Sequence, residues 1–103
     1  MATGISVTIS GNTATLALDG RFDFHSQREF RTAYLPLLDD AAVKTIQIEL
    51  GRVIYIDSSA LGLLMLIRER AEASGKTITL CNPTETVRKI FKIANFDKLF
   101  KMA

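Results

Sequence analysis

The sequence has little of what several function classes require. Its 103 residues include one cysteine, Cys81, and one histidine, His25. A single cysteine cannot form an intramolecular disulfide, and one His with one Cys does not make a ligand set for a metal. The Gly-x-Ser-x-Gly elbow of α/β-hydrolases is also missing. We therefore expect a protein that has no metal or cofactor and is not an enzyme.

Long apolar runs and dense clusters of one charge are missing as well. The longest stretch of apolar residues and glycine spans residues 60–67, whereas a helix that crosses a bilayer needs about 20 such residues. The first residues lack the charged and apolar segments of a secretory signal. The net charge is only +2, without the basic stripe of nucleic-acid-binding proteins. We expect a cytoplasmic protein that neither inserts into a membrane nor binds nucleic acid directly.

The composition is that of an ordinary globular domain. Hydrophobic residues make up 48% of the chain and charged residues 23%. No repeat, low-complexity segment or linker interrupts the sequence. A chain of this length is enough for one hydrophobic core. We therefore expect a single domain over residues 1–103.

The first two strands are predicted by alternation. Residues 5–10 (ISVTIS) and 13–18 (TATLAL) alternate apolar and polar side chains on either side of Gly11-Asn12. This pattern predicts a β-hairpin in which each strand has one solvent-exposed face, and in which the second strand ends at Asp19-Gly20.

Later strands are predicted by runs of β-branched residues. Residues 45–50 (TIQIEL) and Thr77–Cys81 (TITLC) fit this description. Residues 53–56 (VIYI) either extend the first of these strands or form a separate segment after Gly51-Arg52. Strands that alternate with helices in this way favour parallel pairing.

The first predicted helix begins near Gln27. Ser26 with Glu29 three residues later is a capping-box pattern. Proline lacks an N–H and clashes with the preceding turn, so Pro36 should kink or end the helix near Leu35. The apolar residues that recur at helical spacing are Phe30, Ala33, Tyr34 and Leu37.

Two more helices follow. Residues 58–74 form a helical pattern that Gly75 should end in a left-handed conformation. Asn82 as cap and Pro83 as first helical residue predict the start of the next helix. One face of the middle helix is expected to carry Leu61, Leu64 and Met65, and the last helix should bury Val87, Ile90, Phe91 and Ala94.

These elements give the order ββαβαβα. We expect an α/β sandwich with a mixed sheet of about four to five strands and helices packed mainly on one side. The later strands should be parallel and joined by right-handed crossovers.

Two turns between strand and helix contain candidate functional residues, residues 20–26 (GRFDFHS) and 56–62 (IDSSALG). Parallel strands end at the same edge of a sheet, so Asp23 and Ser58 are expected to lie near one another. Ser58 and Ser59 are either caps, satisfying N–H groups of the first helical turn, or exposed hydroxyls for modification or contact. The residues alone leave both interpretations open.

Three motifs in order resemble the STAS domain family, in particular the stand-alone anti-sigma factor antagonists. They are residues 20–23 (GRFD), 57–62 (DSSALG) and 81–83 (CNP). The resemblance covers essentially the whole chain and implies a STAS-like fold. It also implies a partner-binding surface at the turns, formed by Asp23, Asp57, Ser58, Ser59, Leu61 and Gly62.

The resemblance implies a phosphorylation site at Ser58. In the family the unphosphorylated protein binds an anti-sigma factor that is also a serine kinase, and so releases a sigma factor. Phosphorylation breaks that complex, and a PP2C-type phosphatase restores it. One alternative is a STAS docking subunit, in a lipid-transport ABC system or a stress-signalling scaffold, without a phospho-switch. A hydrolase triad of Ser58, His25 and Asp23 is a weaker alternative, since no complete catalytic motif accompanies it.

Overall fold

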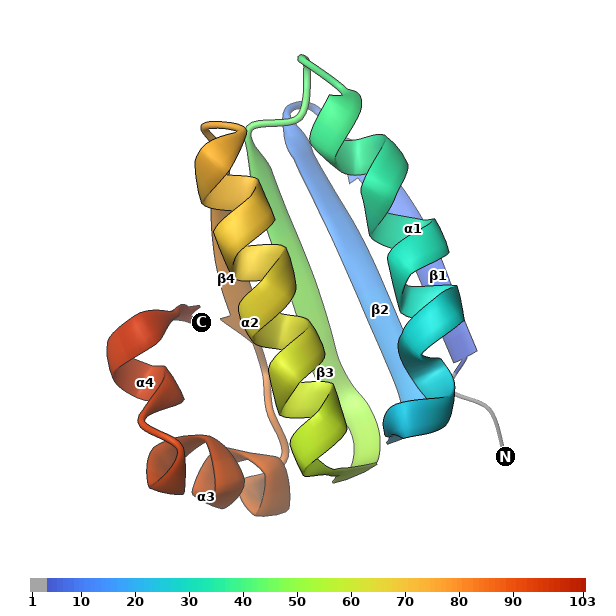
Figure 1. Ribbon diagram of the computed structural model, residues 1–103. Coiled ribbons are helices and arrows are strands. Elements are labelled where there is room, and N and C mark those ends of the chain that lie inside the picture. The colour runs from blue at the N-terminus through green and yellow to red at the C-terminus, as the bar shows by residue number, and fades with distance from the viewer. Residues whose placement is uncertain (1–3) are drawn as a thin grey trace.

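The computed structural model describes residues 4–103, and its framework is one mixed five-stranded sheet (Figure 1). The strands are β1 (Gly4–Ser10), β2 (Thr13–Phe22), β3 (Thr45–Ile56), β4 (Thr77–Cys81) and β5 (Lys101–Met102), and they lie in this order across the sheet. β1 pairs antiparallel with β2, and all other neighbours are parallel. The predicted mixed sheet is confirmed, although β5 was not predicted as a strand.

The helices cover mainly one face of the sheet, as expected. They are the short 3-10 helix η1 (Phe24–Ser26) and the α-helices α1 (Gln27–Asp39), α2 (Ser58–Ala73), α3 (Glu85–Ile93) and α4 (Phe96–Leu99). Figure 1 shows α1 and α2 side by side on that face, with α3 and α4 beyond β4 at the edge away from β1. Both α1 and α2 begin at the same end of the sheet, where β2 and β3 stop.

The core lies between this sheet face and the helices. Side chains alternate along a strand, so every second residue of β2 and β3 points toward the helices. The fully buried core side chains include Leu16, Leu18, Ile46, Ile48 and Leu50 from the strands and Phe30, Tyr34, Leu64 and Ile67 from the helices. The opposite face is polar, and its half-buried residues include Thr15 and Gln47. Burial of apolar surface therefore holds α1 and α2 on one face only.

The N-terminal hairpin turns at Gly11-Asn12 as predicted, with Gly11 at a φ of 60°. The prediction that Asp19-Gly20 closes the second strand is wrong, because β2 continues to Phe22. The register of β2 against β3 shifts twice, between Ala17 and Asp19 and between Gly20 and Arg21. These irregularities let β3 run as one strand through Ile56, so the VIYI segment extends it.

The prediction that α1 breaks near Leu35 is also wrong, because the helix continues through Pro36 to Asp39. Pro36 and Thr32, whose carbonyl would have received the missing bond, are both exposed. Water can reach that carbonyl, so the cost of a missing hydrogen bond is reduced. Tyr34 and Leu37 are buried on the inner side and hold both sides of Pro36 against the sheet.

The cap of α3 differs from the prediction as well. Thr84, not Asn82, caps this helix, and its Oγ1 accepts from the N–H of Val87 at 3.3 Å. Asn82 adopts a left-handed conformation at a φ of 52°, and its side chain donates to Glu49 at 3.0 Å. Pro83 therefore precedes the cap instead of opening the helix.

The helix α2 is close to its predicted extent and ends at Ala73, before the left-handed Gly75. Its buried stripe includes Leu64 as expected, whereas Leu61 and Met65 are only half-buried. The other buried residues of this helix are Ala60, Ile67 and Ala71. Within residues 4–103, no helix is both long and apolar enough to cross a membrane.

Candidate functional site

The two turns singled out in the sequence meet at one edge of the sheet. Phe22 and Ile56 are partners in the parallel pair of β2 and β3, so Asp23 and Asp57 follow paired residues. The backbone N–H of Asp57 donates to the carbonyl of Phe22 at 3.4 Å. This confirms the expectation that the turns share an edge.

The carboxylate of Asp57 joins the two turns. Its Oδ1 accepts from the N–H of Ala60 at 2.8 Å and caps α2. Its Oδ2 accepts from the N–H of Phe24, in the other turn, at 3.2 Å. Hydrogen bonds to an ionised acceptor are stronger than neutral ones. One side chain thus fixes the start of α2 relative to η1.

Ser58 and Ser59 are the first two residues of α2, and both are exposed. Within residues 4–103, neither hydroxyl takes part in a hydrogen bond. Since Asp57 supplies the side-chain cap, the interpretation of the two serines as caps is wrong. Nearby, Leu61 is half-buried and Gly62 is exposed, and a Cβ on Gly62 would meet no atom within 4 Å. The start of α2 is therefore open, with two accessible hydroxyls.

Asp23 occupies the equivalent position in the other turn but is only 9% exposed. Its Oδ1 accepts from the N–H of His25 at 2.9 Å, and its Oδ2 lies 3.7 Å from Nε of Arg21. Ser26 Oγ accepts from the N–H of Asp23 at 3.1 Å and donates to the carbonyl of Arg21 at 3.3 Å. The capping box therefore joins Asp23 and Ser26, and the predicted Ser26–Glu29 box is wrong.

Phe24 is a candidate contact residue that sequence reasoning missed. It is 62% exposed and, with Gln27, Ser59, Gly62 and Leu63, lines a hollow of about 220 Å³ between η1 and α2. No local signal in the sequence indicated its exposure, because a strand continued by two residues would point Phe24 into the core as it does Phe22. The chain instead leaves β2 after Phe22. A large apolar side chain exposed beside open helix residues is a common feature of contact surfaces.

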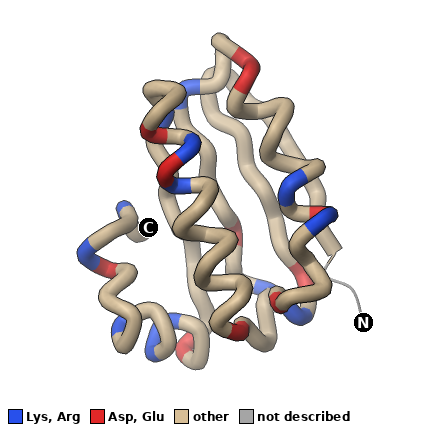
Figure 2. Tube along the Cα trace, in the orientation of Figure 1, with Lys and Arg blue, Asp and Glu red and all other residues tan. Residues whose placement is uncertain are grey.

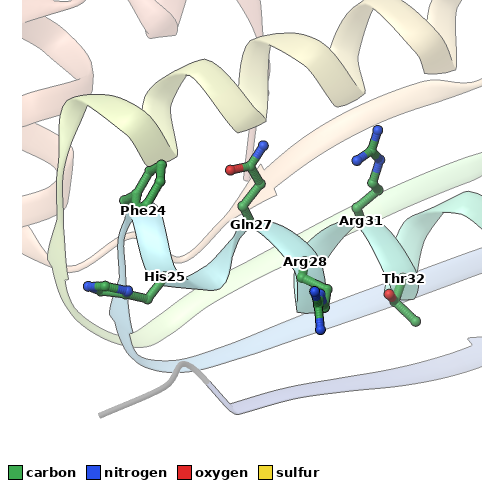
Figure 3. A pocket seen from close by; sticks show the side chains of 6 residues that line it. All are labelled: Phe24, His25, Gln27, Arg28, Arg31 and Thr32. Atoms are coloured by element: carbon green, nitrogen blue, oxygen red, sulfur yellow. The ribbon is translucent and has the colours of Figure 1, made fainter.

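A second hollow of about 420 Å³ extends from Phe24 along α1, and its other lining residues are His25, Gln27, Arg28, Arg31 and Thr32. Figure 3 shows Phe24, Gln27 and Arg31 pointing to one side of η1 and α1, and His25, Arg28 and Thr32 to the other. The lining of this hollow contains two arginines and no acidic residue. By contrast, α2 has no charged residue from Ser58 to Ile67, as Figure 2 shows.

The contacts at this edge do not assemble a hydrolase triad. Asp23 directs its carboxylate to the backbone of His25 and toward Arg21. The imidazole of His25 packs edge-on against Phe24, with ring centroids 5.8 Å apart. Asp23 is thus engaged in its own turn and does not orient His25 as a catalytic base.

Cys81 lies away from this edge and is buried at the end of β4, as expected for a small hydrophobic residue. Burial raises the pKa of its thiol from the usual value, and the charge of Glu49 adds to this shift. A thiol with a raised pKa forms little thiolate at neutral pH and is a weak nucleophile.

Residues 5–101 match a family model described as "Mlab, STAS domain". The chain belongs to the STAS domain family. It is 39% identical over 95 residues to a STAS-domain containing protein of Pseudomonas aeruginosa, with 90% of each chain covered. It is 31% identical over 87 residues to an anti-sigma F factor antagonist of Lysinibacillus sphaericus, covering 84% of this chain and 74% of that one. The predicted family is confirmed.

Solved structures of STAS proteins have the same fold. The anti-sigma factor antagonist SpoIIAA in its unphosphorylated form is 26% identical, with a TM-score of 0.75 and coverage of 97% of this chain and 87% of that one. The Bacillus SpoIIAA in its phosphorylated form is also 26% identical, with a TM-score of 0.75, and the match covers 97% of this chain and 91% of that one. A STAS domain protein of Planctomyces limnophilus, 17% identical, has a TM-score of 0.83 over 95% of this chain and 87% of that one. These matches confirm the predicted α/β fold.

Proposed function

We propose that this STAS protein is an anti-sigma factor antagonist whose binding is switched off by phosphorylation of Ser58. The observation that carries the proposal is the hydroxyl of Ser58, which is exposed at the first position of α2 and makes no hydrogen bond within residues 4–103. A hydroxyl without a structural role can be modified without breaking a bond of the fold. The two solved forms of the similar protein SpoIIAA support the same proposal.

In the unphosphorylated state the start of α2 forms a neutral contact surface. Ser59, Gly62 and the half-buried Leu61 lie on the first turns of the helix, and Phe24 flanks them. Small and neutral residues let a partner approach closely, and an exposed aromatic ring supplies apolar area for an anchor. Asp57 positions this surface by holding both turns together.

In the phosphorylated state the same surface would carry about 1.5–2 negative charges on Ser58. The free N–H groups and dipole at the start of α2 stabilise such an anion locally by about 0.3–1 kcal/mol. The fold therefore tolerates the phosphate. A partner packed over the turn would have to desolvate the anion beside Asp57, which is strongly unfavourable.

The proposed partners follow from this role. The surface binds an anti-sigma factor with serine kinase activity, which phosphorylates Ser58 and is then released. A PP2C-type phosphatase removes the phosphate and restores binding. These reactions place the protein in the cytoplasm, together with the sigma factor that it controls indirectly. The protein itself supplies the contact surface and the acceptor hydroxyl, and no catalytic group.

A pull-down tests the proposal. Wild-type protein, a Ser58→Asp variant and a Ser74→Asp variant are used as baits, and captured proteins are identified by mass spectrometry. Ser74 is an exposed serine at the other end of α2, so it controls for added charge. We expect an anti-sigma kinase to be captured by the wild type and by the Ser74 variant, but not by the Ser58 variant. Capture of identical partners by all three baits would instead favour a constitutive docking subunit.

A further inference from the structure

The outer edge of β1 is unusually open for a sheet edge. Among residues 4–103, β1 pairs with β2 on one side, and no strand pairs with it on the other. It spans Gly4–Ser10, seven residues with the sequence GISVTIS, and its register with β2 has no shift. Natural edge strands are usually short, bulged, charged or proline-bearing, which prevents them from pairing with other chains. β1 has none of these protections.

The backbone of β1 offers regular hydrogen-bonding groups at this edge. A hairpin closed by a two-residue turn has a hydrogen-bonded closing pair, here Ser10 with Thr13. Hydrogen-bonded and non-hydrogen-bonded pairs then alternate along the strands. The backbone groups of Ile9, Val7 and Ile5 therefore point away from β2. These unpaired N–H and C=O groups form a template for another strand.

The side chains of β1 are self-complementary in one antiparallel register. With Val7 opposite Val7 of a second copy, Ile5 lies opposite Ile9, and Ser6 lies opposite Thr8. Apolar side chains then meet apolar ones on the helix side of the sheet, and hydroxyls meet hydroxyls on the polar side. All seven residues of the strand are paired in this register. It also brings the outward-pointing backbone groups of both copies into hydrogen-bonded pairs.

We infer that β1 is a dimer interface, at which a second copy of this chain adds its own β1 in antiparallel orientation. The helix side of β1 carries apolar area for such a contact, since Val7 is 43% exposed and Ile9 51% exposed. The interface is symmetric, with the same patch on both copies, as in most homodimers. The product is one continuous sheet whose helices all lie on the same face.

The dimer leaves the candidate partner surface free. β1 forms one edge of the sheet, whereas η1 and the start of α2 lie at the end where β2 and β3 stop (Figure 1). The two-fold axis passes between Val7 of one copy and Val7 of the other, so the two copies point these ends in opposite directions. Each copy would then present Ser58 to a separate partner, and the dimer would be bivalent.

Analytical ultracentrifugation tests the dimer, with protein from about 1 µM to about 1 mM, a range that covers weak and moderate affinities. The wild type should approach twice its mass of 11.4 kDa as concentration rises. Val7→Pro removes only an outward N–H, so the β1–β2 bonds persist, and it should weaken the dimer at least tenfold. Val7→Lys should do the same if the proline variant unfolds. Ile93→Lys replaces another exposed apolar residue, on α3, and should leave the dimer unchanged.

Cross-linking tests the register. In a Cys81→Ser background, Val7→Cys places two thiols opposite one another, within the Cα distance that a disulfide requires. Ile5→Cys places its two copies four residues apart along the strands, about 13 Å, which is too far. We expect mild oxidation to cross-link the Val7 variant at least tenfold more than the Ile5 variant. A wild type that stays monomeric at all concentrations, or equal cross-linking of both variants, would overturn the proposal.

Discussion

The two turns at the functional edge start alike and end differently. Each has an aspartate directly after a paired strand residue, and each aspartate caps the helix that follows. In the first turn the carboxylate of Asp23 is buried and Ser26 is fully buried, with its hydroxyl bonded to the turn itself. In the second turn Asp57 is half-exposed, and the hydroxyls of Ser58 and Ser59 bond to nothing within residues 4–103.

The difference shows that a serine near a helix start has two distinct uses. Ser26 satisfies a backbone N–H that would otherwise be buried without a partner, which is costly. The hydroxyl of Ser58 satisfies no backbone group of residues 4–103, because Asp57 has already capped α2. The first serine belongs to the fold, and the second is available for chemistry. Variants at these positions therefore separate stability from binding.

Ser58→Glu should change partner binding more than any other variant considered. The added anion must be desolvated by a partner that packs over the start of α2, so we expect a loss of about 3 kcal/mol or more, over a hundredfold in affinity. The melting temperature should move by only a few degrees, because a helix N-terminus tolerates an acid. Calorimetric titration against the anti-sigma kinase and thermal melting measure the two effects.

A matched control for this variant is Thr86→Glu. Thr86 is exposed in the first turn of α3, so the substitution adds the same charge at another helix start. Binding should be unchanged. If the Thr86 variant loses as much affinity as the Ser58 variant, the loss comes from net charge and not from the edge.

The second effect is on stability, from Asp57→Ala. This variant loses the cap of α2 and the bond to Phe24, and we expect it to unfold about 2 kcal/mol more easily. Asp57→Asn keeps an acceptor for Ala60 but not a second carboxylate oxygen for Phe24, so its loss should be smaller. For Asp57→Asn, the relative decrease in the rate of Ser58 phosphorylation should exceed the relative decrease in the free energy of unfolding. Urea unfolding and phosphorylation rates provide the measurements.

Thr84→Ala is the comparison for Asp57→Ala, because Thr84 caps α3 without joining two turns. Any greater loss of unfolding free energy in Asp57→Ala than in Thr84→Ala measures the contribution of the hydrogen bond from Phe24 to Asp57. Equal losses in the two variants would mean that the bond from Asp57 to Phe24 adds nothing.

The third effect concerns Phe24. Replacing this exposed ring by alanine removes an apolar anchor, and we expect partner binding to weaken by about 1–2 kcal/mol. Stability should change by no more than about 0.5 kcal/mol, since the side chain is mostly in solvent. Ile93→Ala, at a residue on α3 that is 84% exposed, serves as control and should not affect binding. Unchanged affinity in the Phe24 variant would remove this residue from the contact surface.

The smallest effect is the difference between two serine-to-alanine variants. Ser26→Ala leaves the N–H of Asp23 without its acceptor and should cost about 1 kcal/mol or more of stability. Ser58→Ala should change stability by less than about 0.5 kcal/mol and should keep partner binding. Melting curves of the two variants, recorded together, measure the contrast. A Ser58 variant that is the less stable of the two would show that its hydroxyl has a structural role.

Most of the fold was predictable because its signals are local. Alternation in the hairpin and β-branched runs in β3 and β4 predicted the strands, and their order with the helices predicted the parallel sheet. Tertiary packing decided the exceptions. Pro36 stays inside α1 because it lies on the exposed side of a helix held by buried neighbours. β5 has two residues, too few to show a period, and depends on pairing with β4.

The site was predictable as a location but not in its bonding. The motifs and the shared sheet edge predicted that both turns lie together. Ser26, however, could form a capping box with Glu29 or with Asp23. Only the structure shows that Ser26 bonds back to Asp23, so that α1 has no side-chain cap. The carboxylate of Asp57 joins residues 33 positions apart in sequence, a contact without a local signal. Exposure of Phe24 likewise depends on where β2 ends.

Mapping the phosphate tests directly whether Ser58 is the residue that is phosphorylated. Wild type, Ser58→Ala and Ser59→Ala are incubated with ATP and the cognate anti-sigma kinase, and intact mass and phosphopeptides are measured. We expect one phosphate on the wild type and on the Ser59 variant, located on Ser58, and none on the Ser58 variant. A phosphate on Ser59 or Thr84 of the wild type, or a Ser58 variant that is phosphorylated as fast as wild type, would contradict it.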